Sequence, residues 1–194
     1  MKLLYTPKSH FARKVRILID ALSLDVELLD AGNVADNSPD IFVSNPLMKV
    51  PTLIDDDQVI FESDLIAHYI VTHSDPKDSF KVLTQNWPTL NARAVMNGVM
   101  SAEVELIMAE RSGINTEKYT RFDKLRNVVV LGLEWLEQHA KVFKGQPSYC
   151  GFHLVSLWDH LLLYQMFDLT YPTLKKAVDD LSAIDFINLS SPLE

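Results

Sequence analysis

The sequence predicts an α+β protein, with strands and helices mixed in its N-terminal part and helices alone in its C-terminal part. Over the first eighty residues the apolar residues switch repeatedly between strand and helix spacing, and after about residue 85 no convincing strand pattern appears. The length of 194 residues is enough for one large domain or two small ones that share a core. Because the composition changes near residues 74–85, we expect domains at 1–76 and 86–194, joined by a linker at 77–85.

A strand and a helix open the N-terminal part. Lys2–Thr6 is a short apolar run ended by a proline, as in a buried strand. The following apolar residues recur at steps of four, three and four and predict a helix over residues 10–22: Phe11, Val15, Leu18 and Leu22. Arg13, Lys14 and Arg16 fall away from this stripe, so we expect them on the polar side of the helix.

Later elements of this part are shorter. They are a strand at Val26–Leu29, at most a short helix around Asp40–Val43, strands at Thr52–Ile54 and Val59–Phe61, and a helix at Asp64–His73. The polar stretch 30–49 is the most loop-like, because it is rich in Gly, Asn, Ser and Pro. The predicted order is β-α-β-(α)-β-β-α.

The C-terminal part reads as a series of helices. We expect them at Trp87–Glu110, at about Glu117–Lys141, at Leu154–Phe167 and from Pro172, before a tail from Phe186 without periodicity. The helix at Leu154–Phe167 is the most apolar, so we expect it in the core. The apolar stripe of the second helix is predicted to hold Val128, Leu131, Trp135 and Leu136.

Composition excludes several classes of protein. Hydrophobic residues make up 47% and charged residues 23%, and no apolar run approaches the roughly 18 to 20 residues of a membrane helix. The net charge of −8 argues against binding nucleic acid or anionic membranes by bulk charge. The single cysteine, Cys150, forbids an intrachain disulfide, and the N-terminus stops being apolar at Pro7, too early for a signal peptide. We therefore expect a cytoplasmic protein.

Ser9 is a first candidate functional residue, because it lies between a predicted strand and a predicted helix. A helix N-terminus offers free N–H groups and a partial positive charge, so it stabilises an anion, to which a hydroxyl can donate. The alternative is that Ser9 is simply a helix cap. Its neighbour His10 has no second ligand at a fixed spacing, so we expect a satisfied or exposed histidine and no metal site.

A second group of candidates surrounds Pro51 and Ser63. Because a proline cannot donate to a strand ladder, we expect Val50 on a strand edge, with its N–H and C=O free for a ligand's peptide group. Ser63 is predicted to cap the next helix, whose N-terminus would hold a carboxylate, while Glu62 could bind an ammonium group. The pair suits the zwitterionic end of an amino acid, and the alternative is an ordinary strand edge and cap.

These residues, in this order and spacing, resemble the cytosolic glutathione transferase superfamily over residues 1 to about 185. The matching pieces are Ser9 with the basic residues 13–16, Lys49-Val50-Pro51-Thr52-Leu53, Glu62-Ser63, and Ser156 with Asp159. Ser9 and its helix are most similar to bacterial serine-type members. The resemblance implies a thioredoxin-like domain with a cis proline at Pro51 and then a helical domain, whose central helix Ser156 and Asp159 would open as a capping box.

The resemblance also implies the site and the activity. Glu62 and Ser63 would bind the γ-glutamyl end of glutathione, Val50 the cysteinyl peptide, and Lys49, in a loop with Asn33, would meet the glycine end. Ser9 would be catalytic, stabilising the thiolate for attack on a small hydrophobic electrophile, with no metal or bound organic cofactor. Family members pair as homodimers, and the helices at Asp64–His73 and Trp87–Glu110 carry apolar surface for such pairing. A non-catalytic binding or partner-docking protein is the alternative.

The electrophile is expected in a cleft between the two parts. Its predicted lining is Pro7, His10, Phe11, Met96, Met100 and Glu103. The alternative for the two methionines is that they belong to the core. Cys150 is expected in a loop, as a thiol without a role.

Overall fold

A four-stranded mixed sheet forms the N-terminal part of the protein. The computed structural model describes residues 1–35, 38–42 and 45–193. The strands are β1 (Lys2–Tyr5), β2 (Glu27–Asp30), β3 (Thr52–Asp55) and β4 (Gln58–Phe61). Their order is β2-β1-β3-β4, with β1 parallel to β2 and antiparallel to β3, and β3 antiparallel to β4. Parallel β1 and β2 require a crossover, which the helix between them supplies.

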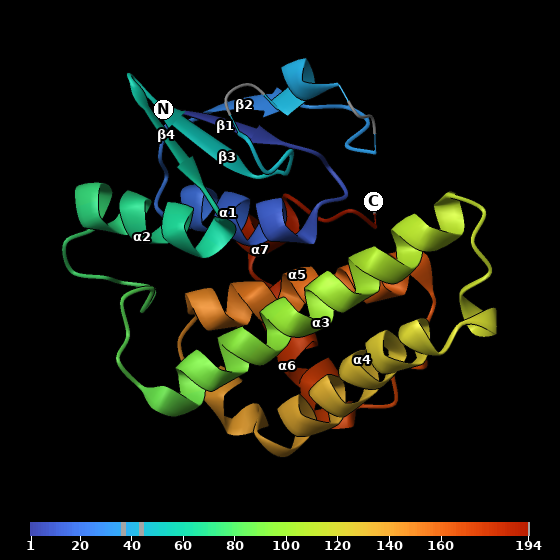
Figure 1. The fold of residues 1–194 in the computed structure, drawn as a ribbon. Helices are drawn as coiled ribbons and strands as arrows, with labels where there is room; N and C mark the ends of the chain where they lie inside the picture. The colour runs from blue at the N-terminus through green and yellow to red at the C-terminus, as the bar shows by residue number, and fades with distance from the viewer. Residues whose placement is uncertain (36–37, 43–44, 194) are drawn as a thin grey trace.

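Two helices, α1 (His10–Ala21) and α2 (Ser63–Ser74), cover one face of this sheet and separate it from the helical part (Figure 1). The helix α1 packs against α5 of the helical part as well as against α2. The short 3-10 helix η1 (Pro39–Phe42) matches the predicted helix around Asp40–Val43, of which Val43 lies outside the described residues.

The C-terminal part is entirely helical where it is described (Figure 1). Its α-helices are α3 (Trp87–Arg111), α4 (Thr120–Gln138), α5 (Tyr149–Tyr164), α6 (Pro172–Ser182) and α7 (Asp185–Asn188), with the 3-10 helices η2 (Thr116–Lys118) and η3 (Ala140–Phe143). The longest pair, α3 and α4, pack together, and α5 contacts both α1 and α3. The predicted fold class and element order are confirmed.

Three details of the helical part differ from the prediction. The helix α5 begins at Tyr149, with Ser148 as its cap, and so includes Cys150, which was expected in a loop. The predicted tail contains α7, which packs on α1. On α4 the predicted stripe is wrong at Leu131, which is 62% exposed, and it omits the buried residues Val129 and Leu133. Its other members are in the core or pack against it: Val128, Trp135 and Leu136. In a helix apolar around much of its circumference, the period alone does not show which side meets the partner helix.

The helix α1 is buried on two sides, and this reverses the prediction for its basic residues. The side chains of Arg13 and Lys14 are buried, although they lie away from the apolar stripe. One side of α1 faces the sheet and the other faces α5, so the polar side of the helix also lies inside the protein. These two cations consequently need buried anionic partners.

Two further observations concern the organisation of the chain. Between the last residue of α2, Ser74, and the first of α3, Trp87, the chain forms neither helix nor strand. Among the described residues, no helix is both long and apolar enough to cross a membrane.

Candidate functional site

The register of the sheet brings the candidate residues to one edge. Tyr5, the end of β1, pairs with Asp30, the end of β2. Antiparallel pairing places Thr52, the start of β3, opposite both Leu4 and Phe61, so the end of β4 lies at this edge too. The chain segments leaving β1 and β4 and entering β3 therefore meet there. These segments carry the predicted site residues: Ser9, Lys49–Pro51 and Glu62–Ser63.

Ser9 caps α1. Its side-chain oxygen accepts a hydrogen bond from the backbone N–H of Ala12 at 3.2 Å, and its own N–H donates to the carbonyl of Thr6. The residue is half-buried and lies at the positive end of the helix. Capping leaves the hydroxyl proton free to be donated, and the two interpretations of Ser9 are therefore compatible.

Val50 and Pro51 lie just before β3, and the bond between them is cis, as the resemblance implies. The sequence predicts Val50 on a strand edge, but the strand that follows it, β3, lies between β1 and β4. The backbone of Val50 is nevertheless outside the ladder, which begins at Thr52, and it makes no hydrogen bond to any described residue. Asn45 holds this segment in place, donating from its side-chain nitrogen to the Lys49 carbonyl and to the Thr52 hydroxyl, both at 2.9 Å.

Glu62 and Ser63 form the turn from β4 into α2. Glu62 occupies the N-cap position with a φ of 65°, and its side chain makes no capping hydrogen bond. A residue other than glycine is strained in this left-handed region, and such strain is concentrated at functional sites. Ser63 is the first residue of α2 rather than its cap, which corrects the prediction. Its side chain is buried, and its hydroxyl has no hydrogen-bond partner among the described residues.

The two charged candidates face solvent. Lys49 and Glu62 are both exposed, on segments that meet at the same edge of the sheet. Asn33, in the loop after β2, is also exposed, and its side-chain oxygen accepts from the N–H of Ala35. Lys49 and Glu62 therefore place charges of opposite sign at the end of the sheet where the backbone of Val50 has no hydrogen-bond partner among the described residues.

Directly behind Ser63, Asp64 is the centre of a buried polar network. One of its carboxylate oxygens accepts from the ammonium of Lys14 at 2.9 Å and from the hydroxyl of Tyr149 at 3.0 Å. The other oxygen accepts from the amide of Asn97 at 2.7 Å. The guanidinium of Arg93 lies 3.4 Å from the first oxygen, the one that accepts from Lys14. This network connects the start of α2 to α1, α3 and α5, and it fixes the position of the neighbouring Ser63.

Burial and pairing set the charges of this network. Burial lowers the pKa of Lys14 to about 8, although the nearby carboxylate of Asp64 acts in the opposite direction. The pKa of Asp64 lies well below its ordinary value, because Lys14, His153 and Arg93 outweigh the effect of its burial. Lys14 and Asp64 are both ionised at neutral pH.

Arg13 forms a second buried ion pair that corrects another prediction. Its guanidinium lies 2.7 Å from the carboxylate of Asp159 in the middle of α5. Ser156 is also in mid-helix, and its hydroxyl donates to the carbonyl of Phe152 four residues earlier. Ser156 and Asp159 are therefore not a capping box, because the helix begins seven residues before Ser156, counting from Tyr149.

The predicted lining of the electrophile cleft is mostly inaccessible. Met96 and Met100 are 0% exposed and belong to the core, which was the alternative interpretation. His10 and Glu103 are buried too, while Pro7 is exposed and Phe11 half-buried. The expectation of a satisfied or exposed His10 is wrong, because the side chain is buried and neither ring nitrogen makes a hydrogen bond to any described residue.

Sequence reasoning missed how His10 is placed. In the structure its ring packs on that of His160, with the ring centres 3.8 Å apart, and the Oε2 atom of Glu103 lies 2.8 Å from Nδ1 of His160. His10, Glu103 and His160 are 57 to 150 positions apart in the sequence. Such distances form no short motif from which their contact could be predicted. Cys150 is buried, and burial raises the pKa of its thiol to about 12, so it is unreactive.

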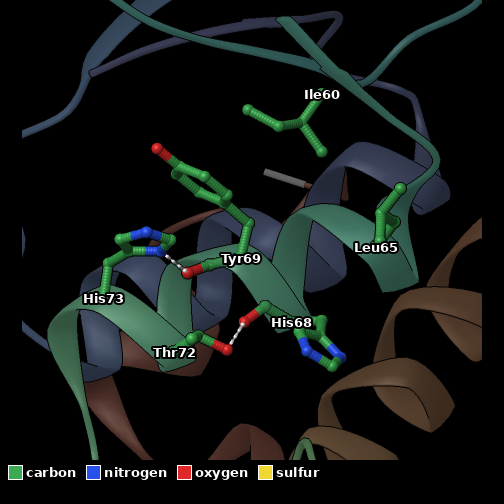
Figure 2. A pocket seen from close by; sticks show the side chains of 6 residues that line it. All are labelled: Ile60, Leu65, His68, Tyr69, Thr72 and His73. Carbon is green, nitrogen blue, oxygen red and sulfur yellow. Dashed lines mark hydrogen bonds between the residues drawn. The ribbon is translucent and has the colours of Figure 1, made fainter. Parts of the chain in front are cut away.

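An open apolar hollow of about 210 Å³ lies on α2, away from the network (Figure 2). It is lined by Ile60, Leu65, His68, Tyr69, Thr72 and His73. Leu65 is 57% exposed at its rim. Tyr69 is fixed by donating to the carboxylate of Asp55 at 2.9 Å. The hollow is a surface feature of the N-terminal part.

Solved structures show which fold this is. A glutathione S-transferase of Methylobacillus flagellatus KT with bound glutathione has a TM-score of 0.84 at 23% identity, covering 98% of each chain. One of Methylobacterium radiotolerans JCM 2831, in complex with glutathione sulfonate, has a TM-score of 0.83 at 20% identity, covering 98% of this chain and 94% of that one. The protein therefore has the fold of the glutathione S-transferases.

Sequence comparison adds a match over the N-terminal part. Residues 3–78 match the family model of the glutathione S-transferase N-terminal domain.

A further solved structure shares the fold. It is a maleylacetoacetate isomerase of Methylobacterium extorquens AM1, solved with malonate and glutathione, with a TM-score of 0.74 and 23% identity, covering 100% of this chain and 97% of that one. Among curated proteins, no sequence matches this chain.

Proposed function

We propose that the protein is a glutathione transferase that binds glutathione, activates its thiol as the thiolate and adds it to a small hydrophobic electrophile. One observation carries the proposal. The register of the sheet brings together the N-termini of α1 and α2 and the backbone of Val50, which makes no hydrogen bond to any described residue. These would be three separate binding elements for one peptide-like anion. The structural neighbours solved with glutathione support this choice of ligand.

Each part of glutathione would have its own partner. The γ-glutamyl carboxylate would bind at the start of α2, where the hydroxyl of Ser63 has no partner among the described residues, and the ammonium would bind to Glu62. The backbone of Val50 would pair with the cysteinyl peptide. Pro51 has no N–H to donate, so the chain just before β3 stays outside the ladder, and the glycine carboxylate would extend toward Lys49.

Ser9 would then activate the thiol. A thiol with a pKa of about 8.5 is only about 3% ionised at pH 7, and lowering that pKa by two units needs about 2.7 kcal/mol. One hydrogen bond to a charged acceptor supplies about 1.5 to 3 kcal/mol, and a helix N-terminus about 0.3 to 1 kcal/mol more. The Ser9 hydroxyl at the N-terminus of α1 offers both contributions. This role corresponds to the bacterial serine-type members, and glutathione would act as co-substrate rather than as a bound cofactor.

The alternative is a non-catalytic protein that binds glutathione or docks a partner. Isomerases among the structural neighbours show that this fold accompanies more than one activity. Ser9, a half-buried residue whose hydroxyl lies at a helix N-terminus, favours the enzyme. We also propose the division into domains at 1–76 and 86–194, a cytoplasmic location and a homodimer that pairs through the apolar hollow on α2.

Calorimetric titration with glutathione tests the proposal. We expect one binding site per chain, followed by turnover with at least one compound in a panel of electrophiles and hydroperoxides. Binding without turnover across the panel would favour the non-catalytic alternative. Absence of binding at millimolar glutathione would contradict both.

A further inference from the structure

Three buried side chains from three helices meet beneath the start of α1. They are His10, the first residue of α1, Glu103 of α3 and His160 of α5, with exposed fractions of 2%, 0% and 4%. One nitrogen from each histidine and one carboxylate oxygen all lie within 4.8 Å of one another. We call these three residues the His-Glu-His cluster. None of its three members belongs to the proposed glutathione site, although His10 follows Ser9 in the sequence.

Several polar atoms of the cluster have no hydrogen-bond partner among the described residues. Both ring nitrogens of His10 and the Oε1 atom of Glu103 are buried and unpaired, while Oε2 of Glu103 lies 2.8 Å from Nδ1 of His160. A buried polar group without a partner is costly, and such groups in a folded protein are usually paired with protein atoms, water or an ion. The orphaned atoms belong to the same three residues whose donor atoms converge.

We propose that His10, Glu103 and His160 bind one divalent transition-metal ion, with zinc as the best match. Two imidazole nitrogens and one carboxylate oxygen are a ligand set that zinc accepts, whereas calcium and magnesium prefer oxygen ligands alone. In a tetrahedral zinc site the ligand atoms are about 3.3 Å apart, so the cluster must contract by at most about 1.5 Å. A metal would satisfy His10 and Glu103 at once.

The ion would clamp three helices that belong to both parts of the chain. It would connect α1, which covers the sheet, to α3 and α5 of the helical part. This role does not depend on the proposed glutathione chemistry. The sequence predicts no metal site, because His10 alone has no second ligand at a fixed spacing and the fold is needed to bring the other two.

Cobalt titration of the full chain tests the proposal. After dialysis against EDTA and removal of the chelator, we expect Co²⁺ to give visible d–d absorption that saturates at one ion per chain and is displaced by Zn²⁺. Glu103→Gln and His160→Gln should each weaken this binding by at least about 100-fold, since each removes one of three ligands. The matched control is the double variant His73→Gln, His139→Gln, because both side chains are exposed and lie outside the cluster. It should bind as the unaltered protein does.

A second readout does not rely on any variant. With free Zn²⁺ at 100 times its dissociation constant, the thermal midpoint of the unaltered chain should rise by about 5 to 10 °C. Absence of both the cobalt absorption and the thermal shift would overturn the proposal, and the orphaned atoms would then be satisfied by water. Metal binding that survives both cluster variants but is lost in the control would also overturn it.

Discussion

The ammonium nitrogen of Lys14 lies 2.9 Å from the Oδ1 atom of Asp64, and the lysine side chain is 0% exposed. This ion pair joins the middle of α1 to the first turn of α2, directly beside Ser63. The same lysine also donates to the side-chain oxygen of Asn97 on α3 at 3.0 Å. The pair therefore fixes the start of α2, where we propose that glutathione binds, relative to the rest of the protein.

Removing the anion of this pair should destabilise the fold. Asp64→Asn leaves the Lys14 ammonium buried without a counter-ion, so we expect the free energy of unfolding to fall by about 3 kcal/mol, the low end for a broken buried pair. The low end applies because the side chain of Asp64 is 32% exposed. Urea denaturation measures the loss. The control, Asp179→Asn, breaks an exposed pair with Lys175 and should cost less than about 0.5 kcal/mol. Equal effects of the two variants would contradict the role of Asp64.

Two buried histidines predict that acid destabilises the protein. The pKa values of His10 and His153 both lie well below the ordinary value, mainly through burial. Below about pH 6.5 the unfolded chain therefore binds more protons than the folded one, and stability falls as the pH drops from 7 toward 5, by up to about 1.4 kcal/mol per pH unit for each histidine. Urea denaturation at several pH values, in EDTA, measures this slope. His153→Gln should reduce it and His68→Gln, at an exposed position, should not.

Ser63→Ala should weaken glutathione binding by roughly 10- to 150-fold, the loss of one charge-assisted hydrogen bond of about 1.5 to 3 kcal/mol. Calorimetric titration gives the dissociation constant. Ser74→Ala, at the other end of α2 and exposed, is the matched control and should bind normally. An unchanged dissociation constant in Ser63→Ala would remove this hydroxyl from the site.

The proposed homodimer can be tested at the hollow on α2. Light scattering should give twice the chain mass of 22.0 kDa at micromolar concentration. Leu65→Lys places a charge at the rim of the hollow and should produce monomers, because an unpaired charge is not tolerated inside an apolar interface (Figure 2). Leu131→Lys changes an equally exposed leucine on α4 and should leave the dimer intact. A monomeric unaltered protein would contradict the proposal.

Periodicity predicted the element order, because each strand and helix shows its own spacing in the sequence. It could not predict that α1 is covered on two sides, so Arg13 and Lys14 were expected on a polar face and are in fact buried in ion pairs. Long-range pairing also explains the error over Ser156 and Asp159. Their spacing is that of a capping box, but Asp159 is the partner of Arg13, which lies 146 residues away.

Local sequence was a better guide to the candidate site than to its surroundings. Ser9, Val50 and Ser63 adjoin strand ends, and the order of the strands alone brings such ends to one edge. The His-Glu-His cluster was invisible, because its three members come from helices that meet only in the folded protein. Whether the hydroxyl of Ser63 caps a helix or lies one residue inside it depends on the backbone angle of Glu62, which the sequence does not specify.

The pKa of glutathione's thiol when bound to the protein tests the proposed function most directly. Ultraviolet absorbance of the thiolate, recorded against pH, should give a value about two units below the 8.5 of a free thiol. Ser9→Ala should raise that pKa by one to two units while glutathione binding stays nearly intact, and Ser9→Thr, which keeps the hydroxyl, should stay close to the unaltered protein. If the low pKa survives in Ser9→Ala, or is lost only in His10→Ala, Ser9 is a helix cap and the proposed mechanism is wrong.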